Sequence, residues 1–168
     1  MKRKIPSILC TLAVIFGMFA TSLMDVRASG YNDDIQVDGS YLTTEDKSTG
    51  STSGGISPQG VYLMDGECSV TNAGVGKVYV YAATTGNTDL DYLSVVMYVD
   101  QYDEKEGNWG QVYFEQAEAY DTYYVATSKQ LKVDRGYYYR VRASHVGGMD
   151  DAQPYDETFS VTDGIYIK

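Results

Sequence analysis

Few residues of this chain have the chemistry for covalent catalysis. His145 is the only histidine, and it follows Ala143 by two residues, which places it on the strand face expected to point inward. One interpretation makes His145 a general base at the mouth of that strand, and the other makes it a partly buried histidine that holds the following loop. The sequence has no Gly-x-Ser-x-Gly motif and no histidine and cysteine cluster with zinc spacing. We therefore expect no catalytic residue and no metal ligand.

Cys68 is the other candidate nucleophile. It is the only cysteine downstream of a predicted export signal, so no internal disulfide is expected in the exported chain. Its neighbours Glu67 and Ser69 supply no basic group that would stabilise a thiolate. A buried free thiol is the expected state, and a catalytic thiol is the alternative.

Acidic residues gather near the C-terminal end, at Asp150, Asp151, Asp156 and Glu157. Clustered carboxylates bind calcium, so a calcium loop is one interpretation. The sequence has no EF-hand pattern, and we expect a solvated acidic loop with no cofactor. Two carboxylates at a suitable separation also hydrolyse glycosides, so a secreted hydrolase that uses His145 or a carboxylate pair is an alternative function. No glycine-rich loop opens a helix, and nucleotide binding is therefore not expected.

Tyrosine is the most unusual feature of the composition, because the chain has 17 tyrosines and 4 phenylalanines. Tyrosine suits surfaces that are apolar on the ring face and wet at the hydroxyl edge, as binding surfaces are. If two tyrosine-bearing strand faces meet in one sheet, they form a binding platform for an extracellular protein or glycan, with charge pairing through Asp100. The predicted platform consists of Tyr92, Tyr98, Asp100, Tyr102, Tyr138, Arg140 and Arg142. The alternative is cross-strand tyrosine pairing that only stabilises an exposed sheet.

The clearest of the strands that must position these residues is the segment 135–143. Gly136 belongs to a predicted turn, where glycine accommodates a positive φ. After the turn, alternation separates a face expected in the core from a face that must reach water or acidic partners. The first face is Tyr137, Tyr139, Val141 and Ala143, and the second is Tyr138, Arg140, Arg142 and Ser144.

The pattern Tyr-x-Tyr-x-Val-x-Ala after a glycine turn resembles the strand of immunoglobulin-like and fibronectin type III sandwiches that carries the tyrosine corner. This resemblance implies that Tyr137 buries its ring and bonds its hydroxyl to upstream backbone. On that basis Tyr137→Ala would cost about 3–5 kcal/mol of stability. A tyrosine-rich strand without such a corner is the alternative.

The rest of the chain from Gly60 onward shows short alternating segments separated by turn residues, and no amphipathic helix of three turns. We expect an all-β fold, an antiparallel immunoglobulin-like β-sandwich of about 7–9 strands over residues 59–168. The expected strands are 61–64, 67–71, 77–83, 90–102, 109–119, 121–127, 130–133 and 137–144, followed by a final strand over 158–161 and 165–167 that is broken at Asp163-Gly164. Turns are expected at 65–66, 84–89 and 103–108, and a surface loop at 146–154.

The first residues are typical of an export signal. Lys2, Arg3 and Lys4 precede an apolar run too short to span a bilayer comfortably, and we place cleavage after Ala28. The alternative is an uncleaved N-terminal anchor. Residues 29–58 are rich in Ser, Thr, Gly and Asp, and are expected to form a flexible leader. Cleavage would remove four of the 13 basic and one of the 23 acidic residues, so the formal charge falls from −10 to −13. Such a chain repels nucleic acid and anionic membranes.

Several segments together resemble a family of small secreted proteins of Gram-positive bacteria with no established activity. They are residues 60–63, 76–81, 98–102 with Trp109, 123–129, 135–145 and 162–167. This resemblance implies a signal peptide and one β domain, and it carries over no catalytic residue.

The sequence therefore predicts a secreted protein without enzymatic activity that acts by surface recognition of an extracellular partner, with no membrane span after signal cleavage. One alternative is a carbohydrate-binding module that uses exposed tyrosines, and others are the hydrolase above and a purely structural extracellular protein.

Overall fold

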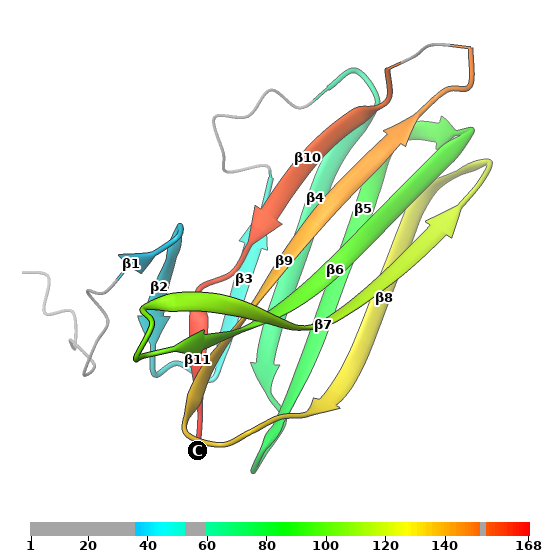
Figure 1. The fold of residues 1–168 in the computed structure, drawn as a ribbon. Coiled ribbons are helices and arrows are strands. Elements are labelled where there is room, and N and C mark those ends of the chain that lie inside the picture. Colours follow the sequence, from blue (N-terminus) through cyan, green and yellow to red (C-terminus); the bar gives the residue numbers. More distant parts are fainter. Residues whose placement is uncertain (1–35, 53–59, 152–153) are drawn as a thin grey trace, which may run out of the picture.

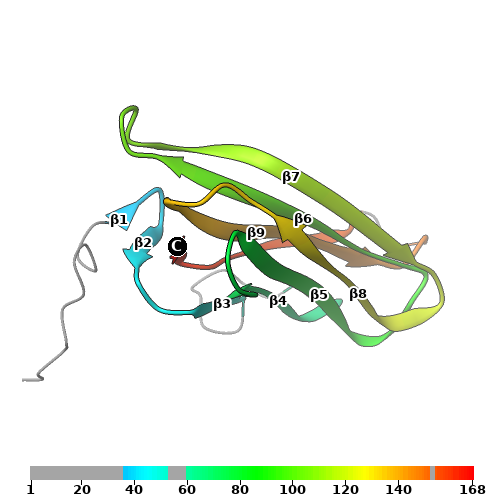
Figure 2. The ribbon, with the colours of Figure 1, turned by 90° about the horizontal axis from the view of Figure 1, so that it is seen from below.

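The computed structural model describes residues 36–52, 60–151 and 154–168. Its strands form two facing layers, which Figure 2 shows nearly edge-on. The predicted all-β sandwich is confirmed. Among the described residues, no helix has the length and hydropathy needed to cross a bilayer.

The first sheet forms the front layer in Figure 1. Its strands follow the order β1, β2, β11, β9, β6, β7, and β10 pairs with β9 beside β11. All of its pairs are antiparallel except β2 with β11. The bounds are β1 (Gln36–Val37), β2 (Ser40–Thr43), β6 (Tyr92–Asp103), β7 (Asn108–Ala119), β9 (Tyr137–Gly148), β10 (Asp156–Val161) and β11 (Gly164–Ile167).

The second sheet lies behind the first and is antiparallel throughout, in the order β3, β4, β5, β8. Its strands are β3 (Lys47–Ser51), β4 (Leu63–Asn72), β5 (Lys77–Leu90) and β8 (Thr122–Lys132). Strands β4, β5 and β8 correspond to A, B and E of an immunoglobulin-like sandwich, and β7, β6, β9 and β10 correspond to C′, C, F and G. The described residues hold eleven strands, more than the predicted 7–9, because β1, β2 and β3 are additional.

The core lies between the two sheets and follows the alternation of the strands. Strand β6 contributes Leu93, Val95, Met97 and Val99, all fully buried, and β5 contributes Val78, Val80 and Ala82. Burial of apolar side chains at about 25 cal/mol per Å² is the main stabilising contribution in such a core.

The predicted flexible leader is wrong over the described part of residues 29–58. Strand β3 pairs with β4 from Lys47 to Ser51, and β2 pairs with β11. A composition rich in Ser and Thr indicates a linker because it offers little apolar area, but edge strands are held by backbone hydrogen bonds that composition does not reveal. Residues 29–35 and 53–58, and the predicted signal peptide, lie outside the described residues.

Two predicted turns lie inside long strands. Asp65-Gly66 falls within β4 and Gly86-Asn87 within β5, each beside a register shift. Gly66 is required there, because a Cβ would lie 2.4 Å from the His145 ring. Likewise β8 is one strand where two are predicted, and β9 continues to Gly148, so the predicted 146–154 loop is shorter. Irregular strands keep their pairing through bulges, which turn-type residues alone do not distinguish from real turns.

The tyrosine corner is present, but on Tyr139. Its ring is 1% exposed, and its hydroxyl donates to the Asp134 carbonyl oxygen at 2.9 Å. Burial raises the pKa of this hydroxyl to about 12. Tyr137 is instead 42% exposed, so its predicted place in the core is wrong. It begins β9 opposite Ile167, directly after the turn at Gly136, where φ is +86°.

We predict opposite outcomes for these two tyrosines. Tyr139→Ala should lower the free energy of unfolding by about 3–5 kcal/mol, because it leaves a cavity in the core, and Tyr139→Phe by about 1 kcal/mol through the lost hydrogen bond. Tyr137→Ala is the matched control and should cost less than about 1 kcal/mol. Urea unfolding measures all three. A larger loss in Tyr137→Ala than in Tyr139→Ala would contradict the assignment.

Candidate functional site

The strand order brings the predicted binding residues onto one surface, the solvent side of β10, β9, β6 and β7, here called the outer face. Registers place Tyr98 opposite Arg142 and Asp100 opposite Arg140 on the adjacent strands β6 and β9. The two strand faces therefore lie in one sheet, which is the condition that the predicted platform requires. The outer face has two parts that differ in exposure. One part is covered by β1 and β2, and the other is open and begins at Arg142.

A buried carboxylate joins the two arginines. Asp100 is 1% exposed, and its Oδ2 accepts from Arg140 Nε at 3.0 Å and from Arg142 Nε at 2.6 Å. Its Oδ1 accepts from Arg142 Nη2 at 3.1 Å. Charge-assisted bonds of this length are among the strongest in proteins. Asp100 thus forms ion pairs with two guanidinium groups on one side of the sheet.

Arg140 is itself 1% exposed, and the β1–β2 hairpin covers it. The hairpin turns at Asp38-Gly39, where both φ values are positive, as a tight Asp-Gly hairpin requires. Nη1 of Arg140 donates to the Asp38 carbonyl at 2.8 Å and to Ser40 Oγ at 3.0 Å, and Nη2 donates to Asp38 Oδ2 at 2.7 Å. The guanidinium holds the pKa of the Asp38 carboxyl below its usual value.

Aromatic rings complete the covered part. The Arg140 guanidinium lies 4.5 Å from the centre of the Trp109 ring, and Trp109 Nε1 donates to the Val37 carbonyl at 2.9 Å. Tyr102 and Tyr138 are buried with Leu42 of β2. The predicted exposed platform is therefore wrong for Tyr102, Tyr138 and Arg140, because the unforeseen hairpin packs on them. Asp100 pairs with the arginines as predicted, but it is buried and not exposed.

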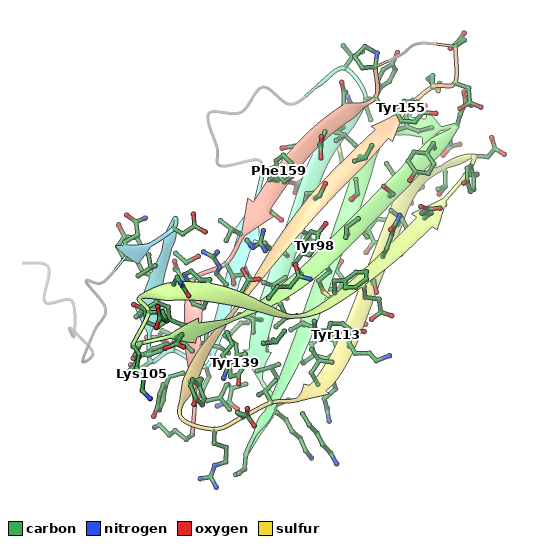
Figure 3. The ribbon with its side chains drawn as sticks, in the orientation of Figure 1. Tyr98, Lys105, Tyr113, Tyr139, Tyr155 and Phe159 are labelled. Carbon is green, nitrogen blue, oxygen red and sulfur yellow. The ribbon has the colours of Figure 1, made fainter. Side chains whose placement is uncertain are left out.

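The open part of the outer face is a groove of about 480 Å³ along β10 and β9. Arg142, whose side chain is 41% exposed, lies in it with its guanidinium 5.2 Å from the Tyr98 ring centre. Phe159 is 67% exposed on the groove wall. Figure 3 looks onto this face, with Tyr98 near the middle of the sheet and Phe159 on β10. Tyr98 and Arg142 are thus the predicted residues that remain accessible in the groove.

Sequence reasoning missed the other apolar residues of this face. Phe159 and Val161 are exposed beside Ser144 and Arg142, and Phe114 is exposed beside Tyr98. Their signal was the alternation of the predicted strands 158–161 and 109–119, which placed large apolar residues on the side away from the core.

Tyr92 lies at the far end of the outer face from the arginines. Its ring stacks on Tyr155 at 5.5 Å and contacts Tyr120 at 5.6 Å, and its hydroxyl donates to Glu118. Figure 3 shows Tyr155 near the upper end of β9 and β10. Tyr92 therefore shares the predicted face but not the arginine cluster.

His145 is fully buried between the sheets, so the interpretation as a general base at an open strand mouth is wrong. Its Nδ1 is 2.8 Å from Thr84 Oγ1, and its Nε2 is 2.8 Å from Ser160 Oγ. Thr84 Oγ1 donates its proton to the Ser94 carbonyl, which assigns the proton of the neutral ring to Nδ1. The histidine thus forms hydrogen bonds with two buried hydroxyl groups, and its ring is not accessible to a substrate.

Cys68 is buried, and two carboxylates of the acidic loop bond to neighbouring groups of the domain. The Cys68 thiol is free and buried, as predicted, and burial raises its pKa to about 11. Asp156 accepts the backbone N–H groups of Tyr62 and Leu63, and Asp150 accepts the Tyr155 hydroxyl. In the described part of the chain no group of three histidine, cysteine or acidic side chains is arranged to hold a metal ion.

Comparison with known proteins gives no relative: no family model, no curated protein and no solved structure matches this chain. The inference about function therefore depends on the geometry of the outer face.

We predict that Asp100→Asn lowers the free energy of unfolding by about 3–5 kcal/mol, because it removes the buried carboxylate and leaves Arg140 with only the solvent-exposed Asp38 as an anionic partner. Glu104→Gln, an exposed change of the same charge in the loop after β6, should stay within about 0.5 kcal/mol. Chemical denaturation of the two variants measures the difference. Equal stabilities would show that the pair contributes little.

We also predict a stability loss in mild acid that depends on His145. Burial lowers its pKa from 6.5 to about 4, and the charge of Asp65 partly offsets that effect. The unfolded chain therefore binds the proton first. The stability that comes from keeping His145 neutral is complete above pH 6.5 and is lost as the pH falls toward 4. We expect the free energy of unfolding to fall by about 2 kcal/mol between pH 7 and pH 5.

His145→Asn provides the test, because its amide can still donate to Thr84 but does not titrate. The slope of unfolding free energy against pH, measured between pH 7 and pH 5, should flatten in this variant. An unchanged slope would show that other groups carry the acid sensitivity.

Proposed function

We propose that this protein is an exported, non-enzymatic recognition module that binds an extracellular partner in the open part of the outer face. The observation that carries the proposal is the groove in which Tyr98, Arg142 and Phe159 are accessible together. Tyrosine, phenylalanine and arginine are the residue types enriched in protein interfaces.

Preorganisation supports this proposal. Two donor atoms of the Arg142 guanidinium bond to the buried Asp100, and the guanidinium lies over the Tyr98 ring. A side chain that is already ordered loses little conformational entropy on binding. The groove therefore presents a fixed cation and two rings on a rigid sheet. The buried positions of His145 and Cys68 favour recognition over hydrolysis.

Glycan binding is a second candidate, favoured by a different surface. On the solvent side of β5 and β8, the Tyr81 hydroxyl bonds to Tyr124 at 2.8 Å and to Glu67 at 3.0 Å. Tyr79 is 42% and Tyr124 is 44% exposed. Aromatic rings with hydroxyl and carboxylate groups at their edges suit sugars, which need both stacking and hydrogen bonds.

Retention experiments distinguish the two surfaces. The chain from Ser29 onward would be immobilised and exposed to extracellular protein fractions and to insoluble polysaccharides. We expect a protein to be retained by the wild type and by Tyr79→Ala/Tyr124→Ala, but lost by Tyr98→Ala/Phe159→Ala. Polysaccharide retention that only Tyr79→Ala/Tyr124→Ala loses would favour the second candidate. Retention that neither double variant affects would contradict both.

A further inference from the structure

We infer that the partner presents a basic, extended polypeptide segment, with cationic side chains at positions i and i+4, that lies across the strands of the outer face. This inference depends on the proposed function and specifies its ligand. It derives from two carboxylates, from the rings beside them and from the charge of the face.

The two carboxylates occupy one row across four strands. Glu118 of β7 is opposite Ser94 of β6, Ser94 is opposite Val146 of β9, and Val146 is opposite Glu157 of β10. Ser94 and Val146, between them, carry no charge. Three strand spacings separate the backbones of the two glutamates, a distance of about 14 Å.

Neither glutamate has a cationic partner among the described residues. The ion pairs found there all join Asp38 or Asp100 to the arginines. Glu118 accepts from the Tyr92 hydroxyl and the Gln116 amide, and Glu157 accepts from Ser144 Oγ. Both side chains are exposed, so each keeps acceptor capacity for a cation from a partner.

Aromatic rings flank the glutamate row on both sides. Tyr92, stacked on Tyr155, occupies the row beyond it, and Phe159 lies two residues from Glu157 toward the groove. Lysine and arginine side chains are attracted to ring faces as well as to carboxylates. The glutamate row therefore offers a cationic side chain both a carboxylate and an aromatic ring face.

Charge complementarity specifies a basic occupant. The outer face carries three carboxylates, Asp100, Glu118 and Glu157, and the hairpin that covers part of it adds Asp38. Against them stand Arg140 and Arg142, so the net charge is negative. The whole chain carries −10. An acidic partner would meet repulsion over the whole approach, whereas a basic one is steered toward the face.

The spacing of the glutamates specifies the arrangement of the cations. In an extended chain, residues i and i+4 point to the same side and lie about 13 Å apart. That separation matches the row of about 14 Å. The residue at i+2 then faces the uncharged middle of the row, where an apolar side chain such as valine fits against Val146.

Two peptides of equal charge serve as probes, Thr-Lys-Thr-Val-Thr-Lys-Thr and its rearrangement Thr-Lys-Lys-Val-Thr-Thr-Thr. Titration into the isotopically labelled chain, followed by NMR, gives affinity and location together. We expect the first peptide to shift the signals of β6, β9 and β10 and to bind at least about fivefold more tightly than the second, with affinity that weakens as salt rises.

Glu118→Gln/Glu157→Gln should weaken binding of the first peptide at least tenfold. The matched control is Glu104→Gln/Glu106→Gln, which removes the same charge from the exposed loop between β6 and β7 and should change affinity less than twofold. Equal weakening in both variants, or equal affinity for both peptides, would overturn the inference. If the immobilised chain then still retained a partner, and the retention still required Tyr98 and Phe159, the proposed recognition function would hold with a different ligand.

Discussion

A guanidinium group held almost entirely away from water is the feature on which the arrangement of the outer face depends. Arg140 lies on the side of β9 that faces away from the core, yet it is 1% exposed. Desolvation of a cation costs several kcal/mol unless close anions and good hydrogen bonds offset it. Asp100 and the Asp38-Gly39 hairpin supply them, and the Trp109 ring covers the remaining side. The N-terminal hairpin is therefore part of the domain.

The same interaction sets the limit between the covered and open parts of the outer face. The hairpin covers the surface around Arg140, and Arg142, two residues further along β9, lies in the groove. Asp100 bonds to both arginines, so it connects the buried cluster to the exposed cation. A change at this carboxylate should thus affect stability and the order of the groove together. Glu157 lines the same groove but forms no ion pair with either arginine, so its carboxylate does not share this dependence.

The sequence predicted the inward face of β9 because alternation follows from strand geometry, and Val141 and Ala143 are buried as expected. It did not distinguish Tyr137 from Tyr139, which share one face. The two differ in burial because Tyr137 begins β9 directly after the turn at Gly136, whereas Tyr139 lies two residues further along the strand, in the core. It also missed the hairpin, although Asp38-Gly39 is a typical hairpin turn, because the surrounding Ser and Thr residues indicated a linker. Coverage by a distant segment is a tertiary property that local patterns do not contain.

The most direct test of the buried cluster is the exchange of arginine side-chain protons with solvent, observed by NMR. We expect a Nε–H signal of Arg140 that is resolved and exchanges slowly, because that proton bonds to Asp100 beneath the hairpin. Arg142, with a side chain that is 41% exposed, should exchange faster. Exchange of the Arg140 proton as fast as that of an exposed arginine such as Arg135 would show that the hairpin does not cover the charge pair.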